Sequence, residues 1–191
     1  MTIDARGNNL AAVGVPVDGS LAIAPAGTVF PAPSEGASST LTIDQAFRKV
    51  GLFTTDGGFA WEMERDGDAI EFYQQGYRIP SGLANVRLKV KAAQYDDLVR
   101  EIAYGKKPDA NGYLTIDGGG HATQYVLFSE EIFKNGVIRR RVAAIASVES
   151  AVLDQSTRGE VNGTEITFAI EPSPLLNNEH IGEWLLNPAT A

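Results

Sequence analysis

The sequence predicts a mainly β protein, an antiparallel β-sandwich or small barrel with one packed α-helix. Apolar residues alternate with polar ones at residues 59–63, 86–90 and 166–170, which is typical of half-buried strands. Only one segment shows a clear helical spacing of apolar side chains over two turns. Strands and helices do not alternate along the chain, so a parallel sheet built from βαβ units is not expected.

The predicted helix covers residues 95–105. Its apolar side chains follow the spacing i, i+3, i+4, i+7: Tyr95, Leu98, Val99 and Ile102. Asp96 and Asp97 lie in its first turn and Gly105 at its end, where acidic residues and glycine favour helix termini. The single apolar stripe predicts that the helix lies on a surface of the sheet.

Other elements are expected on both sides of this helix. A shorter helix is predicted at residues 42–51, with Asp44 near its start and Gly51 at its end. Strands are predicted at residues 113–116, 125–128 and 136–149. Together these elements define a domain covering residues 41–171.

The two ends of the chain have a different composition. Residues 1–40 contain few charged side chains, four prolines and five glycines, so they cannot offset their ordering entropy alone. We expect an extended N-terminal arm that orders against a partner surface, although a flexible tail fits the composition equally well. Deleting it should leave a folded domain. Residues 172–191 are expected to form a C-terminal tail, with Trp184, Leu185 and Leu186 as its apolar cluster.

The composition excludes several classes of function. The 191 residues carry 24 acidic and 16 basic side chains, a net charge of −8, and no cysteine. Disulfides, thiol nucleophiles and thiolate metal sites are therefore ruled out. The acidic balance argues against wrapping nucleic acid, which requires Lys and Arg to neutralise phosphates. No apolar run is long enough to cross a bilayer, and no signal peptide is recognisable.

Candidate catalytic residues are few, and each has a structural explanation. The glycine-rich segment 117–121 precedes a strand rather than a helix, which favours a hairpin turn over a phosphate-binding loop. His121 and His180 have no carboxylate pattern around them. The acidic segments at residues 66–68 and 109–112 are both interpreted as turns. The second resembles the start of a calcium loop but lacks the glutamate that such a loop requires at its twelfth position. We therefore expect a protein without catalytic residues, metal or cofactor.

Arg139, Arg140 and Arg141 form the sharpest charge feature. In a strand, Arg140 points to the same side as Ile138 and Val142, so it must be paired or lie outside the core. Two interpretations remain open. The strand has left the core at this point, or the arginines form salt bridges between subunits.

Residues 51–105 carry a resemblance to a known family. The segment 51–58 (Gly-Leu-Phe-Thr-Thr-Asp-Gly-Gly) leads into Trp61 and the charged residues 62–65. Residues 69–74 (Ala-Ile-Glu-Phe-Tyr-Gln), a polar loop, a strand and a helix closing on Tyr104-Gly105 follow. This order resembles the major tail protein, or tail tube protein, of long-tailed siphovirus-type bacteriophages.

The resemblance implies a structural role without catalysis. Members of that family are β-sandwiches with one packed helix, and they assemble into hexameric rings that stack into a tube through which DNA passes during ejection. The implied partners are further copies of the chain and the tape-measure, tail terminator and baseplate proteins, with no membrane. The implied location is the virion tail, after synthesis in the host cytoplasm.

The same resemblance suggests site residues. The long loop at residues 66–82 matches the loop that contacts the next ring. Its candidate contact residues are Asp66, Asp68, Phe72, Tyr73, Tyr77, Arg78 and Ile79. The arm and the C-terminal tail are expected to contribute further ring-to-ring contacts. A hexamer would carry a net charge of roughly −48, and an acidic lumen would repel DNA phosphates. The candidate lumen acids lie on the polar sides of strands: Glu62, Glu64 and Glu165.

Three alternatives remain open. A related virion ring protein, such as a tail terminator or baseplate component, would stop at one ring. A tube protein of a contractile or secretion machine would share the stacked rings. A ligand-binding β-sandwich, for example one that binds carbohydrate or a receptor, would need exposed aromatic residues on one sheet face, where Trp61 and Trp184 are too few.

Overall fold

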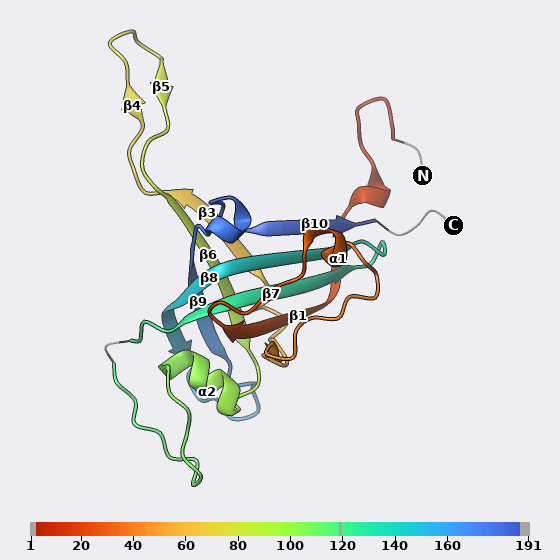
Figure 1. Ribbon diagram of the computed structural model, residues 1–191. Coiled ribbons are helices and arrows are strands. Elements are labelled where there is room, and N and C mark those ends of the chain that lie inside the picture. The colour runs from red at the N-terminus through yellow and green to blue at the C-terminus, as the bar shows by residue number, and fades with distance from the viewer. Residues whose placement is uncertain (1–2, 119, 188–191) are drawn as a thin grey trace. The chain divides into compact units, whose positions relative to one another are not determined.

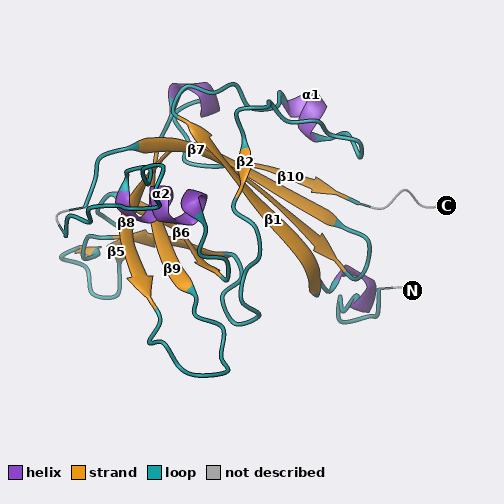
Figure 2. Cartoon of the chain, turned by 90° about the horizontal axis from the view of Figure 1, so that it is seen from below, coloured by secondary structure: helices purple, strands orange, loops and turns teal. Residues whose placement is uncertain are grey.

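Antiparallel strands make up most of the ordered structure, as predicted. The computed structural model describes residues 3–118 and 120–187 (Figures 1 and 2). Its strands are β1 (Pro16–Pro25), β2 (Arg48–Lys49), β3 (Ala60–Arg65), β4 (Ile70–Glu71), β5 (Arg78–Ile79), β6 (Ala84–Ala92), β7 (Gln124–Phe133), β8 (Ile138–Leu153), β9 (Thr164–Glu171) and β10 (Gly182–Leu186). Its helices are α1 (Pro33–Gly36), α2 (Asp97–Tyr104) and two short 3-10 turns, Leu10–Ala12 and Pro174–Leu176.

One large sheet has the strand order β2-β1-β7-β8-β9-β6-β3, and β10 also pairs with β8. Strands β4 and β5 form a separate two-stranded pair. The chain divides into two compact units. Unit 1 comprises Met1–Val50, Tyr125–Ala144 and Pro172–Ala191, and unit 2 comprises Gly51–Gln124 and Ile145–Glu171. The long strand β8 contributes its first residues to unit 1 and its last residues to unit 2.

Unit 1 is built on β1, which pairs with β7 from Pro16 opposite Phe133 to Pro25 opposite Tyr125. Its buried apolar cluster comes from three strands, β1, β7 and β8, and from the segment before β2: Ala22, Ala24, Phe47, Val126, Phe128 and Val142. Partly buried side chains pack against this cluster: Phe30, Leu41, Ile43, Leu176 and Trp184. Both ends of the chain therefore contribute to one core.

The prediction of an N-terminal arm over residues 1–40 is wrong for β1. Residues 21–24 of this strand are at most 3% exposed, and the strand lies between β2 and β7. The sequence Leu-Ala-Ile-Ala is apolar on both faces, so it lacks the alternation that reveals a half-buried strand. Deleting residues 1–40 would remove an internal strand, and we no longer expect it to leave unit 1 folded. Residues 1–2 of the arm lie outside the described residues.

The C-terminal segment is likewise part of unit 1. The apolar cluster predicted in the tail forms β10, which pairs with β8 from Gly182 opposite Val142 to Leu186 opposite Ile138. The end of the predicted tail, residues 188–191, lies outside the described residues. Two local predictions are also wrong. Residues 42–51 form a turn and β2 instead of a helix, because the Asp44 side chain accepts a bond from the Ala46 amide. Residues 113–116 form a loop instead of a strand.

Unit 2 contains β3, β6, β9, the end of β8 and α2. The centres of its strands are almost fully buried on one face, with Leu88, Ile166 and Phe168 at 0% exposed. Leu88 lies directly opposite Phe168. The predicted helix is confirmed as α2: the Asp96 side chain accepts a bond from the Val99 amide, and Gly105 ends the helix at φ +68°.

Candidate functional site

The segment predicted as the ring-to-ring loop is a hairpin, formed by β4 and β5, that extends beyond β3 and β6 of its own unit (Figure 1). Its base is a narrow neck. The Asp66 carboxylate accepts a bond of 2.8 Å from the Leu83 amide, and Ser81 Oγ donates to the Asp68 carbonyl. Two of the predicted contact residues therefore take part in closing the hairpin.

Two glycines allow the backbones of the two segments that form the neck to come into contact. Gly82 has φ +88°, and a Cβ atom there would lie 2.2 Å from the Gly67 nitrogen. A Cβ atom at Gly67 would lie 2.6 Å from the Gly82 Cα atom. Neither position has room for a side chain, so the neck requires glycine at both residue 67 and residue 82.

The tip of the hairpin presents aromatic side chains to solvent. Tyr73 is fully exposed, Tyr77 is 70% exposed and Phe72 is 49% exposed. The turn is closed by a bond from the Phe72 amide to the Tyr77 carbonyl, and Ile70 pairs with Ile79 below it. Large exposed aromatics grouped on one projecting element are typical of an interaction surface.

We predict that Gly82→Ala opens the neck while leaving the tip sequence unchanged. The substitution places a side chain at positive φ, which costs about 1–3 kcal/mol, and also against the Gly67 backbone. The matched control is Gly76→Ala, at φ +89° in the tip with no other atom within 4 Å of the added Cβ. Limited trypsin cleavage after Arg78 should become several-fold faster in Gly82→Ala alone. Equal cleavage rates in the two variants would contradict the inference that the contact between Gly67 and Gly82 holds the base of the hairpin closed.

The polar face of the unit 2 sheet carries paired charges. Arg87 Nε and Nη2 donate to the Glu149 carboxylate at 2.5 and 2.9 Å. Lys89 Nζ lies 3.2 Å from Glu62, and Lys91 Nζ lies 2.8 Å from Asp154. The extra residue of a register shift in β8 supplies Glu149, which reaches Arg87 across β9. Each cation of β6 is therefore matched by a carboxylate.

The three predicted lumen acids lie on or beside this face. Glu62 and Glu64 are opposite Arg87 and Asn85, and Glu165 is opposite Lys91. The placement on a polar strand face is as expected, but Glu62 is paired with Lys89. The face is consequently a mixture of both charges. The sequence shows the basic residues of β6, Arg87, Lys89 and Lys91, but their acidic partners are evident only from the strand register.

The ion pairs of this face predict a pH dependence. The hydrogen bonds from Arg87 hold the pKa of Glu149 below its ordinary value of 4.5, and those from Lys91 do the same for Asp154. Their stabilisation is complete above these ordinary pKa values and is lost as the pH falls through the lowered ones. Glu149→Gln should therefore reduce the unfolding free energy at pH 6, by under about 1 kcal/mol because the pair is solvent-exposed. By pH 2 the difference from the unsubstituted protein should vanish in urea titrations. A difference that persisted there would contradict the assignment.

The arginine triplet is paired within the chain. Arg139 forms two bonds to Glu131, of 3.1 and 2.7 Å, and Arg141 pairs with Glu183 at 2.6 Å. Arg140 is 2% exposed and donates to Glu130 at 2.6 Å. An intersubunit role for Arg140 is wrong, because its guanidinium is enclosed in unit 1. The interpretation that the strand has left the core fails for the same reason.

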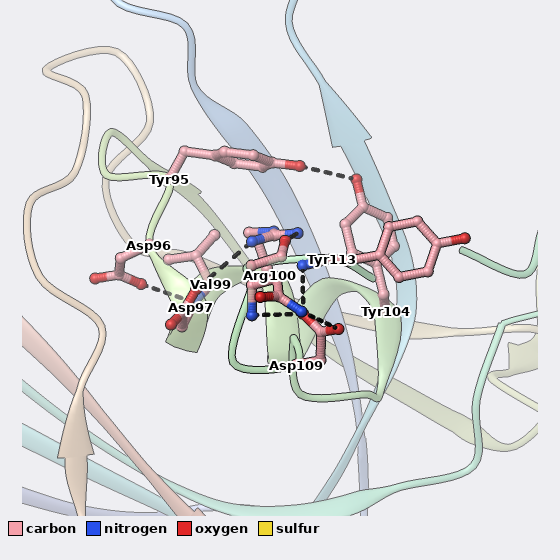
Figure 3. Close-up of polar contacts among 10 residues, drawn as sticks. Tyr95, Asp96, Asp97, Val99, Arg100, Tyr104, Asp109 and Tyr113 are labelled. Carbon is pink, nitrogen blue, oxygen red and sulfur yellow. Dashed lines mark hydrogen bonds and ion pairs between the residues drawn. The ribbon is translucent and has the colours of Figure 1, made fainter. Parts of the chain in front are cut away.

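The outer side of α2 and the following loop form a polar cluster (Figure 3). Arg100 Nη2 donates to the Gly112 carbonyl at 3.0 Å, and Asp109 accepts bonds from the Asn111 and Tyr113 amides. Burial, together with a hydrogen bond between the Tyr104 and Tyr95 hydroxyls, raises the pKa of Tyr104 to about 12. These contacts fix the loop to the helix, which gives Asp109 the structural role expected for it.

His121 also has a structural position. Its Nε2 atom lies 2.8 Å from the Ile102 carbonyl near the end of α2, and its ring packs against Gly105. Gly119, in the turn predicted at residues 117–121, lies outside the described residues. Within residues 3–118 and 120–187, no three His, Asp or Glu side chains gather closely enough to hold a metal ion. No helix in the same ranges has the length and apolarity to span a bilayer.

An open cleft lies in each unit. The cleft of unit 2, about 680 Å³, is lined by Thr54, Asp56, Lys91, Asp154 and neighbouring loop residues. The cleft of unit 1, about 760 Å³, is lined by Phe133, Asn135, Arg139, Leu185 and residues near the N-terminus. In both clefts the basic side chain forms an ion pair, Lys91 with Asp154 and Arg139 with Glu131. Comparison with models of known protein families finds no match, and comparison with curated protein sequences finds none either.

Proposed function

We propose that the protein is a self-assembling structural protein that forms the tail tube of a long-tailed bacteriophage as stacked hexameric rings. The observation that carries the proposal is the projecting hairpin, whose neck is built from glycines and whose tip exposes Phe72, Tyr73 and Tyr77. A monomer gains nothing from exposing three aromatic side chains on one element, whereas burial against a second copy stabilises an assembly.

The sheet supports the same proposal. Strand β3 pairs with β6 on one side and ends the strand order on the other, as does the two-residue strand β2. A six-residue strand at the end of the strand order, such as β3, is a template for pairing with another chain, and closed assemblies remove such edges. A ring of identical subunits supplies that closure.

The charged face of unit 2 suits a conduit for DNA. Its lysines and arginine are engaged by carboxylates, so they are not available to bind phosphates strongly. Glu64 and Glu165 add further negative charge to this face. In the proposed tube this face lines the lumen, and the duplex passes without specific binding. The tape-measure protein before ejection, and terminator and baseplate proteins at the ends, are the proposed partners.

The decisive experiment is electron microscopy of the concentrated protein in negative stain, combined with sedimentation velocity. We expect tubes for the unchanged protein and their loss in the triple variant Phe72→Ser, Tyr73→Ser, Tyr77→Ser. The matched control replaces three exposed residues outside both the hairpin and the terminal segments: Tyr113→Ser, Ile116→Ser and Val161→Ser. Circular dichroism verifies that all three proteins are folded.

The other functions have distinct outcomes in this experiment. Single rings that never stack would indicate a terminator or baseplate protein. Monomers at every concentration would overturn self-assembly and favour the ligand-binding β-sandwich. Tubes that persist in the hairpin variant would remove the hairpin from the assembly contacts.

A further inference from the structure

The segment between β1 and β2 covers the core of unit 1 without joining its sheet. This strap, residues 26–46, contains no strand, and its one helix is the single turn α1. Phe30, Leu41 and Ile43 from the strap pack against the buried cluster that includes Ala22 and Phe128. The strap therefore shields apolar residues of the sheet, although it is not itself part of the sheet.

Two neighbouring side chains of the sheet hold the strap by its backbone. Arg140 Nη1 donates to the carbonyls of Gly36 and Ser38 at 2.7 and 2.5 Å. Trp184 Nε1 donates to the Pro33 carbonyl at 2.9 Å. Trp184 lies directly opposite Arg140 in the pairing of β10 with β8, so the two donors form one site. Glu130 binds the Arg140 guanidinium and orients it.

The fit of the strap at this site depends on Gly36. A Cβ atom on this residue would lie 2.2 Å from Trp184 Cε2 and 2.6 Å from Nε1. The ring of Trp184 in turn lies 6.3 Å from that of Phe128, centroid to centroid. The indole is thus held between the strap and the core, and any larger residue at position 36 separates them.

We propose that the strap is a latch that opens as a unit while β1, β7 and the rest of the sheet remain folded. Within the strap, local backbone bonds join Gly36 to Ala32 and Ser38 to Glu35. Opening breaks the bonds from Arg140 and Trp184, whereas separating β1 from β7 breaks a ladder of pairs along ten residues. Segments with few tertiary bonds open at lower free energy than the core. The open state exposes Trp184 and the apolar residues beneath the strap.

Native-state hydrogen exchange on the full-length protein, followed by mass spectrometry across low guanidinium concentrations, tests the latch. In the unchanged protein, the protected amides of Gly36 and Ser38 should exchange through a sub-global opening with a shallow dependence on denaturant, because only the strap and the surface beneath it become exposed. Amides of β1 and β7 should follow global unfolding, with a steep dependence. If strap and strand amides share one dependence on denaturant, the latch is overturned without any variant.

A matched pair of strap variants provides the second arm. Gly36→Ala drives a methyl group into Trp184, whereas Ser34→Ala alters an exposed residue two positions earlier. Exchange within residues 32–40 should become about tenfold faster or more in Gly36→Ala, the effect of losing a buried hydrogen bond or two. It should be unchanged in Ser34→Ala, and β7 should retain its protection in both. Faster exchange spread equally over strap and β7 in Gly36→Ala would overturn the proposal. Exchange is measured at a concentration where the protein is monomeric, so that assembly does not contribute to the protection.

Discussion

Replacing Arg140 with methionine is expected to lower the free energy of unfolding by about 3 kcal/mol. The side chain is 2% exposed, and its guanidinium binds Glu130 and two strap carbonyls. Methionine fills a similar volume but satisfies none of these acceptors, and unpaired buried polar groups are costly. Guanidinium titrations followed by far-UV circular dichroism measure the loss.

The control for this prediction is Arg87→Met. The guanidinium of Arg87 pairs with Glu149 at similar distances, but the two side chains are 27% and 40% exposed. Water therefore replaces the lost bonds, and the expected loss is under about 1 kcal/mol. If the two substitutions had equal effects, burial would not be what makes the Arg140 site important.

Phe168→Ala is expected to lower the free energy of unfolding by about 3–5 kcal/mol. Phe168 is 0% exposed at the centre of unit 2, opposite Leu88 on β6 and Val148 on β8. Removing the ring leaves a cavity that neighbouring strands cannot fill, because their backbones are fixed by pairing on both sides.

The exposed aromatic Tyr73 supplies the comparison for Phe168. Tyr73→Ala removes a ring from a residue that is fully exposed at the hairpin tip, and we expect a change within about 0.5 kcal/mol. Both variants are measured by thermal unfolding at a concentration where the protein is monomeric. A small effect of Phe168→Ala would contradict the packing of unit 2.

The elements predictable from the sequence are those whose signal is local. Strands β3, β6 and β9 alternate apolar and polar residues, and α2 combines a 3.6-residue period with Asp96 and Gly105 at its ends. Strand β1 was missed because Leu21–Ala24 is buried on both faces, and its pairing partner β7 lies a hundred residues later. No local pattern carries that contact.

The candidate site divides in the same way. The segment 66–82 stands out in the sequence as a long loop with aromatic residues, which are local properties, but its strands β4 and β5 were not predicted. The glycine neck could not be predicted, because the contact between Gly67 and Gly82 depends on how the two segments at the base of the hairpin pass each other. Arg140 is recognisable in the sequence as a charge on an apolar strand face. Its hydrogen-bond partners are the Glu130 carboxylate and the carbonyls of Gly36 and Ser38, the last two about a hundred residues away along the chain. Identifying them required the tertiary structure.

The neck has a consequence for engineering and for divergence of the sequence. A side chain on Gly67 would collide with the backbone of Gly82, and one on Gly82 would collide with the backbone of Gly67. Neither residue can therefore be substituted, whatever the sequence of the hairpin tip. In the turn beyond this neck, a Cβ atom added at Gly76 has no atom within 4 Å. The tip is therefore a natural insertion point. Foreign peptides placed there would be displayed at a position that the two glycines isolate from the folding of unit 2.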